Sequence, residues 1–380
     1  MNKPAAAVKP GKVPLMDFKQ QYSDLREELL AAATRVMDSG MVINGPEVKA
    51  FETEFAAAMG APHCVGCSNG TDAIELALKA CGVGPGDEVA VPAFTFIATA
   101  TAVSSIGAKP VFIDIEPRNF TIDPAALERA LTPRMKAVVP VHLFGFPADM
   151  DAVLAVARKG GLRVVEDCAQ AHGCLYKGKP VGTMGDIGTF SFYPSKNMGA
   201  LGDAGAVVTR DAKLAETCTV LRDAGRAKGE RYLHALPGRN ARLDELQAAF
   251  LRIKLRRLAA WNEKRSKIAA LYRRELKGLP VTPPTEDAAG TRHVYHLFVA
   301  RAQKRDALLE ALTKAEVGCA VYYPVALHMQ PAFKDLGRRE GDFPVSEQAC
   351  REAIALPMYP DLSEESALRV TSEIRKFYKA

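Results

Sequence analysis

A regular alternation of short apolar runs and helical stretches covers residues 61–209 of this 380-residue chain. The helical stretches include residues 71–81 and 124–130. Because parallel strands joined by helical crossovers are buried on both faces, this alternation predicts a mostly parallel α/β sheet with helices on both sides. The expected strands are residues 63–67, 88–91, 110–113, 137–141, 163–165, 189–192 and 205–208.

The period of the pattern changes after residue 242. Leu246, Phe250 and Ile253 recur at helical spacing within a stretch from Leu243 towards Leu276, which predicts one long helix. The proline-rich residues 280–285 then predict a loop or linker.

The rest of the chain predicts a small α+β C-terminal domain. Residues 296–300 and 318–322 are expected to be strands that flank a helix over residues 304–314. The chain is therefore expected to divide into a flexible N-terminal tail, a large domain, and a long helix with the small domain, at residues 1–12, 13–250 and 251–380.

Composition places the chain among ordinary globular proteins, with 48% hydrophobic and 25% charged residues. Its length is sufficient for two packed lobes with a large core. The first twelve residues contain no apolar signal-peptide region, and no uninterrupted apolar run reaches the length that spans a membrane. These features predict a cytoplasmic protein without a membrane partner.

Neither the basic residues nor the cysteines indicate a nucleic-acid or metal site. The net charge is +6, and basic residues concentrate over 222–231 and 252–274. Without interleaved aromatic residues these are expected to be solvated helix faces; nucleic-acid binding, the alternative, predicts salt-sensitive binding to any duplex. The Cys64/Cys67 pair and the Cys168, His172 and Cys174 group lack a second paired motif, so no metal is expected.

One lysine, Lys196, stands between the apolar run 189–192 and the glycine-rich residues 199–205. Burial lowers the pKa of a lysine amine and frees its lone pair, so that it can form a Schiff base with a carbonyl. Pyridoxal phosphate (PLP) is the aldehyde cofactor that best fits this setting. Its pyridinium nitrogen needs a carboxylate, which Asp167 can supply at the end of the apolar run 162–165.

Residues 68–72 follow an expected strand and open an expected helix. The backbone amides of Gly70 and Thr71 at the helix N-terminus, with the Thr71 hydroxyl, are suited to hold a phosphate. An ordinary helix cap is the alternative interpretation.

With these residues in place, the chain resembles the DegT/DnrJ/EryC1/StrS family of sugar aminotransferases. These are PLP-dependent enzymes of the aspartate-aminotransferase fold (fold type I). The similarity extends from residues 13–17 (VPLMD) to residues 356–360 (LPMYP), which is nearly the whole chain.

The resemblance implies a cofactor contact for each matching residue. Gly70 and Thr71 would form the phosphate cup, which Ser191 completes. Phe96 would place its ring against the cofactor face, with Phe94 as the alternative. Asp167 would hold the pyridinium proton, and Gln170 would contact the phenolic oxygen. His172 is expected to have a structural role without an acid-base function.

Residues 238–244 (GRNARLD) match the family's Asn-x-Arg-hydrophobic-acid element. There the asparagine, here Asn240, reaches the cofactor phosphate of the neighbouring subunit, which implies a homodimer with shared sites. Asn240 as a simple turn residue is the alternative. The Leu246, Phe250 and Ile253 stripe is expected to help bury this interface unless it packs within one subunit. Three residues are candidate substrate contacts: Arg242, Tyr323 and His328.

The implied reaction is a ping-pong transfer of an amino group from glutamate to a nucleotide-linked keto-sugar, in amino-sugar biosynthesis for a surface polysaccharide or secondary metabolite. Family members that dehydrate deoxysugars replace Lys196 with histidine, so the lysine favours transamination. Residues 193–205 are more similar to members acting at C3, which favours a 3-keto substrate over a 4-keto one. A non-catalytic regulator on the same scaffold is a further alternative, disfavoured because Lys196, Asp167 and Gln170 are all retained.

Overall fold

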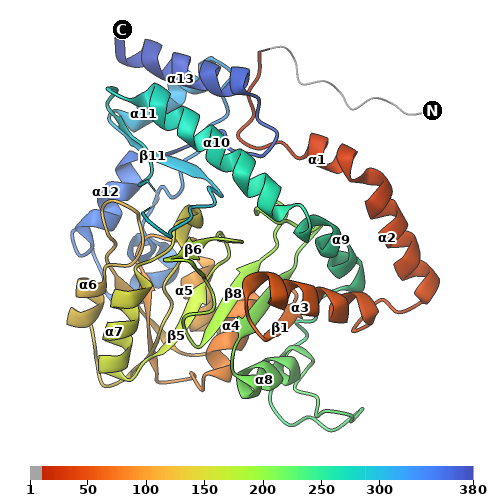
Figure 1. The fold of residues 1–380 in the computed structure, drawn as a ribbon. Coiled ribbons are helices and arrows are strands. Elements are labelled where there is room, and N and C mark those ends of the chain that lie inside the picture. The colour runs from red at the N-terminus through yellow and green to blue at the C-terminus, as the bar shows by residue number, and fades with distance from the viewer. Residues whose placement is uncertain (1–10, 287, 380) are drawn as a thin grey trace.

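Seven strands form the central sheet of the computed structural model, which describes residues 11–286 and 288–379 (Figure 1). Residues 1–10 of the predicted N-terminal tail lie outside this range. The strands lie in the order β1-β9-β8-β5-β4-β2-β3. They are β1 (His63–Cys67), β2 (Glu88–Pro92), β3 (Lys109–Ile113), β4 (Met135–Val138), β5 (Arg163–Asp167), β8 (Ile187–Ser191) and β9 (Gly205–Thr209).

All strands of this sheet run in one direction except β9, which is antiparallel to both of its neighbours. The predicted, mostly parallel α/β sheet is therefore confirmed. Two strands are shifted from their expected positions: β4 is Met135–Val138 where 137–141 was expected, and β8 is Ile187–Ser191 where 189–192 was expected. The remainder of the apolar run 137–141 continues the buried chain towards the edge of the sheet where the strands end.

Helices cover both faces of the sheet (Figure 1). Successive strand side chains point to opposite faces, so Val207 joins one hydrophobic core while Val208 joins the other. The core of Val207 includes residues of α4 (Gly70–Ala80), α5 (Ala98–Ser105) and α8 (Ala212–Arg222). The core of Val208 includes residues of α3 (Pro46–Met59), α6 (Pro124–Arg129) and α7 (Met150–Gly160).

The predicted long helix is two helices, α9 (Glu245–Leu255) and α10 (Leu258–Leu276). The expectation of one uninterrupted helix is therefore wrong. Neither proline nor glycine causes the break; the two helices pack on different partners, α9 on α2 (Arg26–Ser39) and α3, and α10 on α13 (Glu364–Lys379).

Packing of α9 also decides where the Leu246, Phe250 and Ile253 stripe lies. Phe250 and Ile253 are buried in one cluster with Leu29 and Val36 of α2, in the same subunit. Leu246, in contrast, is 36% exposed. Most of the stripe therefore belongs to the interior of one subunit.

A second, three-stranded antiparallel sheet lies beside α10, with strand order β10-β11-β12. Its strands are β10 (Val281–Thr282), β11 (Phe298–Ala302) and β12 (Ala353–Leu356). The helices α11 (Arg305–Lys314) and α13 contribute to the core around these strands. The predicted helix over 304–314 is confirmed, while the boundaries of the three predicted domains stay a prediction.

Two expectations for this region are wrong. Residues 280–285 include the strand β10, which pairs with β11. Residues 318–322 form no strand: Ala320 makes one isolated bridge to Ala355, and the third position in the sheet is taken by β12. The strand-favouring residues of 318–322 are a property of the local sequence. Pairing with β11, in contrast, depends on which segment the fold places beside that strand.

Short elements complete the described chain. They are α1 (Lys19–Asp24), η1 (Leu143–Gly145), β6 (Leu175–Tyr176), β7 (Lys179–Pro180), η2 (Leu327–Met329), η3 (Pro331–Leu336) and α12 (Pro344–Glu352). Across residues 11–286 and 288–379, no helix combines the length and the apolar character needed to cross a membrane.

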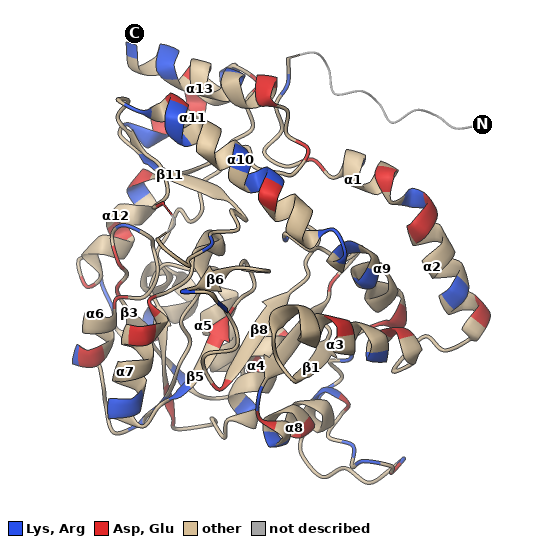
Figure 2. Cartoon of the chain, in the orientation of Figure 1, with Lys and Arg blue, Asp and Glu red and all other residues tan. Residues whose placement is uncertain are grey.

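Basic residues of α9 and α10 alternate with acidic ones or face them from neighbouring helices (Figure 2). Arg252 forms ion pairs with Glu47 and Glu54 of α3, and Arg257 pairs with Glu28 of α2. Such pairing neutralises much of the local charge, as expected for a solvated helix face.

Candidate active site

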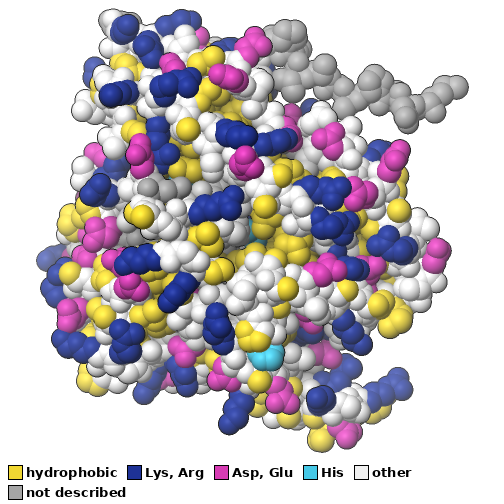
Figure 3. All heavy atoms as spheres, in the orientation of Figure 1, with side chains coloured by type: hydrophobic (Ala, Val, Ile, Leu, Met, Phe, Trp, Pro, Cys, Tyr) yellow, Lys and Arg dark blue, Asp and Glu magenta, His cyan; other side chains and the backbone are white. Residues whose placement is uncertain are grey.

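Three candidate residues meet at the edge of the sheet where the parallel strands end. Asp167 is the last residue of β5, Ser191 is the last residue of β8, and Gly70 opens α4 just after β1. Ligands of open α/β sheets bind outside the carboxyl ends of the strands. Figure 3 shows hydrophobic side chains gathered in the middle of the face in view, between α9, α10 and the sheet.

Asp167 and Lys196 interact electrostatically within this edge. Burial lowers the pKa of the Lys196 amine to about 8, although the Asp167 carboxylate opposes that shift. Burial also raises the pKa of Asp167, an effect that the Ala169 amide and the Thr99 hydroxyl reduce. The pair therefore combines a lysine that loses its proton easily with a carboxylate beside it.

Hydrogen bonds fix the Asp167 carboxylate. The Thr99 hydroxyl on α5 donates to Oδ2 at 2.9 Å, and the Ala169 amide donates to Oδ1 at 3.1 Å. Asp167 itself is 4% exposed. Its carboxylate is thus oriented before any ligand binds, and Thr99 is a contributor that the sequence analysis did not identify.

The turn that carries Lys196 is held by a buried amide network. The Asn197 side chain donates to Oδ1 of Asn262 on α10 and to the carbonyl of Val294, at 2.8 Å each. Asn262 in turn donates to the carbonyl of His172 at 2.8 Å. Asn197 lies next to Lys196 in the sequence, but nothing in the helical pattern around Asn262 indicates this contact.

Close packing brings the start of α4 against the end of β8. A Cβ atom on Gly70 would lie 2.6 Å from the Cβ of Ser191, so only glycine permits this approach. The side chain of Asn69 caps α4 by accepting a hydrogen bond from the Asp72 amide at 2.8 Å. Because the cap uses that amide, the amides of Gly70 and Thr71 in the first turn remain available for an anion.

Gln170 and Tyr323 form a second part of the site. The amide of Phe144 donates to Oε1 of Gln170 at 2.7 Å, and Nε2 of Gln170 donates to the Tyr323 hydroxyl at 3.1 Å. This contact joins the large sheet to a segment 153 residues later in the chain. Burial raises the pKa of the Tyr323 phenol, so the hydroxyl keeps its proton at neutral pH.

Exposure separates the two candidate phenylalanines. Phe96 is 53% exposed with its ring centre 6.2 Å from that of Tyr323, whereas Phe94 is 1% exposed and packs against Phe120 and Phe144. Only Phe96 presents ring surface to a ligand.

Two histidines near these elements are enclosed by protein. His172 packs against the rings of Phe190 and Phe192, and burial together with the Lys196 charge lowers its pKa to about 3. The imidazole of His328 is fully buried and bonds Glu347 at 3.0 Å. His328 therefore offers no surface to a substrate in this arrangement, and its predicted role lacks geometric support.

Asn240 and Arg242 both contact Asp223, at the C-terminal end of α8. Asn240 is exposed and forms a bridge with Asp223, and Arg242 forms an ion pair with the same aspartate at 2.7 Å. The backbone of Arg242 also bridges Cys67 at the end of β1, close to the start of α4. Arg242 therefore lies near the start of α4, and within the described residues neither side chain forms a hydrogen bond or ion pair with Lys196.

Comparison with known proteins identifies the family to which this arrangement belongs. The sequence model of the DegT/DnrJ/EryC1/StrS aminotransferase family matches residues 23–375. This chain belongs to that family. It is an aminotransferase of the PLP-dependent fold type I, and its cofactor is pyridoxal phosphate.

Three similar proteins illustrate the family. The pleiotropic regulatory protein of Geobacillus stearothermophilus is 48% identical, over 97% of this chain and 99% of its own length. The UDP-N-acetyl-3-dehydro-α-D-glucosamine 3-aminotransferase of Acidithiobacillus ferrooxidans is 45% identical, over 96% of this chain and 97% of its own. The crystal structure of DesV from S. venezuelae, in complex with a ketimine intermediate, gives a TM-score of 0.94 at 45% identity, covering 97% of this chain and 99% of DesV.

The site of this aminotransferase has the groups that PLP requires. Lys196 provides an amine with a lowered pKa, and Asp167 provides an oriented carboxylate for the pyridine nitrogen. The close approach of Gly70 to Ser191 leaves backbone amides and a hydroxyl side by side for the phosphate. The residues present therefore fit the cofactor.

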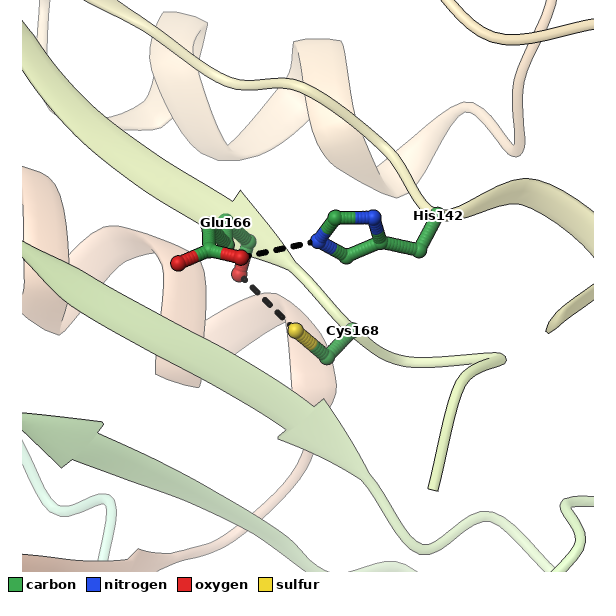
Figure 4. A group of neighbouring side chains, drawn as sticks. All are labelled: His142, Glu166 and Cys168. Carbon is green, nitrogen blue, oxygen red and sulfur yellow. Dashed lines mark hydrogen bonds and ion pairs between the residues drawn. The ribbon is translucent and has the colours of Figure 1, made fainter. Parts of the chain in front are cut away.

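A buried group of His142, Glu166 and Cys168 lies beside Asp167 and resembles a metal site in composition (Figure 4). Its ligand atoms already have partners, however. His142 accepts from the Ala148 amide through Nδ1 and bonds Glu166 through Nε2 at 3.0 Å. Both Glu166 oxygens also accept hydrogen bonds from backbone amides, namely those of residues 182, 184 and 185, at 2.7 Å. The group therefore fixes the loop before β8 and does not offer free ligands to a metal.

A groove of about 570 Å³ lies along β3, the edge strand of the aminotransferase sheet. None of the residues that line it is a candidate residue of the PLP site. The groove is therefore separate from the residues that fit PLP.

Proposed function

We propose that this aminotransferase transfers an amino group from glutamate to the carbonyl carbon of a nucleotide-linked keto-sugar, with the 3-keto sugar preferred. The observation that carries the proposal is the Lys196 amine with its lowered pKa beside the oriented Asp167 carboxylate. An amine and a carboxylate arranged in this way suit the attachment and electronic control of PLP. The product would be an amino sugar for a surface polysaccharide or a secondary metabolite.

Bound PLP supplies an aldehyde that accepts the amino group and a ring that withdraws electrons from the reacting carbon. The residues of the chain bind and orient it. Asp167 would keep the pyridine nitrogen protonated, Gln170 would direct its second N–H towards the phenolic oxygen, and Phe96 would pack against the ring. The phosphate would be held by Gly70, Thr71 and Ser191 of this subunit and by Asn240 of the partner subunit.

Lys196 has two roles in this proposal. Its amine would hold the cofactor, and when free it would accept and return the proton that the substrate Cα exchanges with the cofactor. A pKa of about 8 suits that exchange, because the amine accepts and returns a proton near neutral pH. Arg242 and Tyr323 are proposed to contact the sugar nucleotide.

Preference for carbon 3 is supported by the relative from Acidithiobacillus ferrooxidans, whose name gives a 3-aminotransferase. It is also supported by the similarity of residues 193–205 to members that act at C3. Assay with glutamate and matched pairs of 3-keto and 4-keto nucleotide sugars tests this choice. Faster turnover of the 4-keto sugar of the same nucleotide would contradict it.

A homodimer with shared sites is part of the proposal. Support comes from exposed apolar side chains that one subunit leaves uncovered near the Asn240 side of the site, namely Met41, Val42, Ile43, Tyr232, Leu233 and Leu236. Burial of these side chains against a second copy would place Asn240 across the interface.

Borohydride reduction tests the central assignment. Reduction of the protein with PLP should bleach the visible absorption band and leave a pyridoxyl group on the peptide that contains Lys196. An adduct on another lysine, or no visible band after PLP is supplied, would contradict the proposal.

A non-catalytic regulator is the second candidate, because a relative 48% identical to this chain is named a pleiotropic regulatory protein. The same reduction and the glutamate assay separate the two functions. A regulator that lacks catalysis would show no conversion of glutamate to 2-oxoglutarate with any of the keto-sugars.

A further inference from the structure

Lys254 is a fully buried lysine on α9. Its ammonium donates to the carbonyl oxygen of Gly199 at 2.6 Å. The ring of Tyr22 on α1 lies over the ammonium, with its centre 4.9 Å from Nζ. The burial of a lysine is costly unless its charge is compensated, so these two contacts matter to the protein.

No carboxylate pairs with Lys254 within the described part of the chain. Burial lowers the pKa of its amine to about 8. If Lys254 only filled space in the core, methionine or leucine could take its place without the loss of a needed hydrogen bond. The carbonyl of Gly199, three residues after Lys196, is therefore the partner that explains a cation at this position.

The loop around Gly199 is tightly folded. A Cβ atom on Gly199 would collide with the carbonyl oxygen of Pro194, so only glycine fits there. The Lys196 amide donates to the Tyr193 carbonyl at 2.8 Å, and the Ala200 amide donates to the Phe192 carbonyl at 2.7 Å. These bonds make residues 192–200 one compact unit, so a displacement of the Gly199 carbonyl would also displace Lys196.

Helix α9 contacts this unit at two adjacent points. Gln247 accepts a hydrogen bond from the Leu201 amide at 2.9 Å, and Lys254 binds the Gly199 carbonyl. Residues seven apart lie on the same face of a helix, so one face of α9 supports the loop. The amide network of Asn197 supports the other side of the loop from α10.

We propose that Lys254 is a positioning residue for Lys196: by holding the Gly199 carbonyl, it fixes the turn so that the Lys196 amine faces the Asp167 carboxylate. The inference rests on the proposed function, in which Lys196 carries the cofactor. Lys254 touches neither cofactor nor substrate in this scheme. Its removal is expected to misplace the Lys196 amine while the overall fold is retained.

The test compares Lys254→Met with Lys254→Arg, using Lys264→Met as a matched control. Lys264 is an exposed lysine of α10 that pairs with Asp361 at 3.0 Å. Two readouts are independent of turnover: the rate at which PLP-free protein gains the visible band after PLP is added, and the pH midpoint at which that band changes.

Lys254→Met is expected to slow the gain of the band by about 10- to 100-fold, the effect of displacing a reacting group by roughly 1 Å. It is also expected to shift the pH midpoint, whereas Lys254→Arg should recover part of the rate and Lys264→Met should leave both readouts unchanged. Equal rates and equal midpoints in Lys254→Met and the wild-type protein would overturn the proposal.

Folding of each variant is checked by circular dichroism. If Lys254→Met does not fold, Lys254→Gln takes its place with the same readouts, and unchanged values again overturn the proposal. Loss of folding in both, with Lys254→Arg folded, would assign Lys254 to overall stability and also overturn it. A borohydride adduct of the wild-type protein on a lysine other than Lys196 would instead contradict the proposed function itself.

Discussion

The lysine turn, residues 192–202, and the segment 224–242 differ in how the subunit supports them. Around the turn, Asn197 and Gly199 are buried and bonded to α10 and α9. In the segment, Tyr232 is 80% exposed and Leu233 is 60% exposed, and Asn240 faces solvent. The subunit therefore holds the lysine turn firmly in its interior and leaves much of segment 224–242 exposed.

This contrast fits a division of labour between two subunits. Groups that act on a cofactor need fixed orientation, and Thr99, Asn262 and Lys254 form hydrogen bonds with Asp167, Asn197 and Gly199 from three different helices. Exposed apolar side chains in segment 224–242 suit burial in a subunit interface.

Complementation between two inactive variants is expected to have the largest effect. Lys196→Ala and Asn240→Ala chains should each be inactive alone, yet a mixed dimer contains one site with both residues intact. Activity should rise from background towards about half that of the wild-type dimer, because half of the shared sites are restored. Co-expression with two affinity tags and a glutamate assay measure the recovery. Verified mixed dimers without activity, or an active monomer, would contradict the shared site.

Asp167→Asn is expected to lower turnover by about 10²- to 10³-fold, because it removes a buried charge that stabilises the electron-withdrawing form of the cofactor. Some cofactor should remain bound through the phosphate contacts. The control is Asp123→Asn, which alters a helix cap remote from the site. Turnover near the wild-type value in Asp167→Asn would show that another group protonates the ring nitrogen.

The lowered pKa of Lys196 predicts how its labelling depends on pH. Only the unprotonated amine reacts, and its fraction grows about tenfold per pH unit below the pKa. Covalent attachment of PLP at Lys196 should therefore become faster as the pH rises, with the midpoint of the rate profile near pH 8. An ordinary lysine would give a midpoint near 10.4. Stopped-flow absorbance on PLP-free protein gives the profile, and a midpoint above 10 would show that the amine is not desolvated.

Two substitutions in α9 are expected to have the smallest effect on activity and to change stability or dimer association instead. Phe250→Ala should lower the free energy of unfolding by about 3–5 kcal/mol, since it empties a buried site against α2. Leu246→Ala should change that free energy by less than about 1 kcal/mol and instead weaken dimer association. Denaturant unfolding and sedimentation separate the effects, and the reverse pattern would mean that Phe250 belongs to the interface.

Local patterns determined much of the protein. The expected strand at residues 63–67 coincides with β1, and the other six runs of the large sheet lie within three residues of their strands. The candidate residues Asp167, Ser191 and Gly70 do meet at one edge, because parallel strands place their carboxyl ends together. The spacing of apolar side chains and the direction of a strand depend on residues that are neighbours in the chain, so both can be read from the sequence.

Contacts between distant residues were decided only by the tertiary structure. Nothing near residue 262 indicates that its amide binds Asn197, and helical spacing alone made Phe250 and Ile253 equally suited to an interface or to α2. The strand expected at 318–322 failed for the same reason, since β12 takes its place beside β11. Lys254 shows the limit most clearly: as a sequence letter it is one basic residue among many on α9 and α10, and only folding places its ammonium on the carbonyl of Gly199. Composition and spacing determine which elements form, whereas the choice of partner depends on packing across the whole chain.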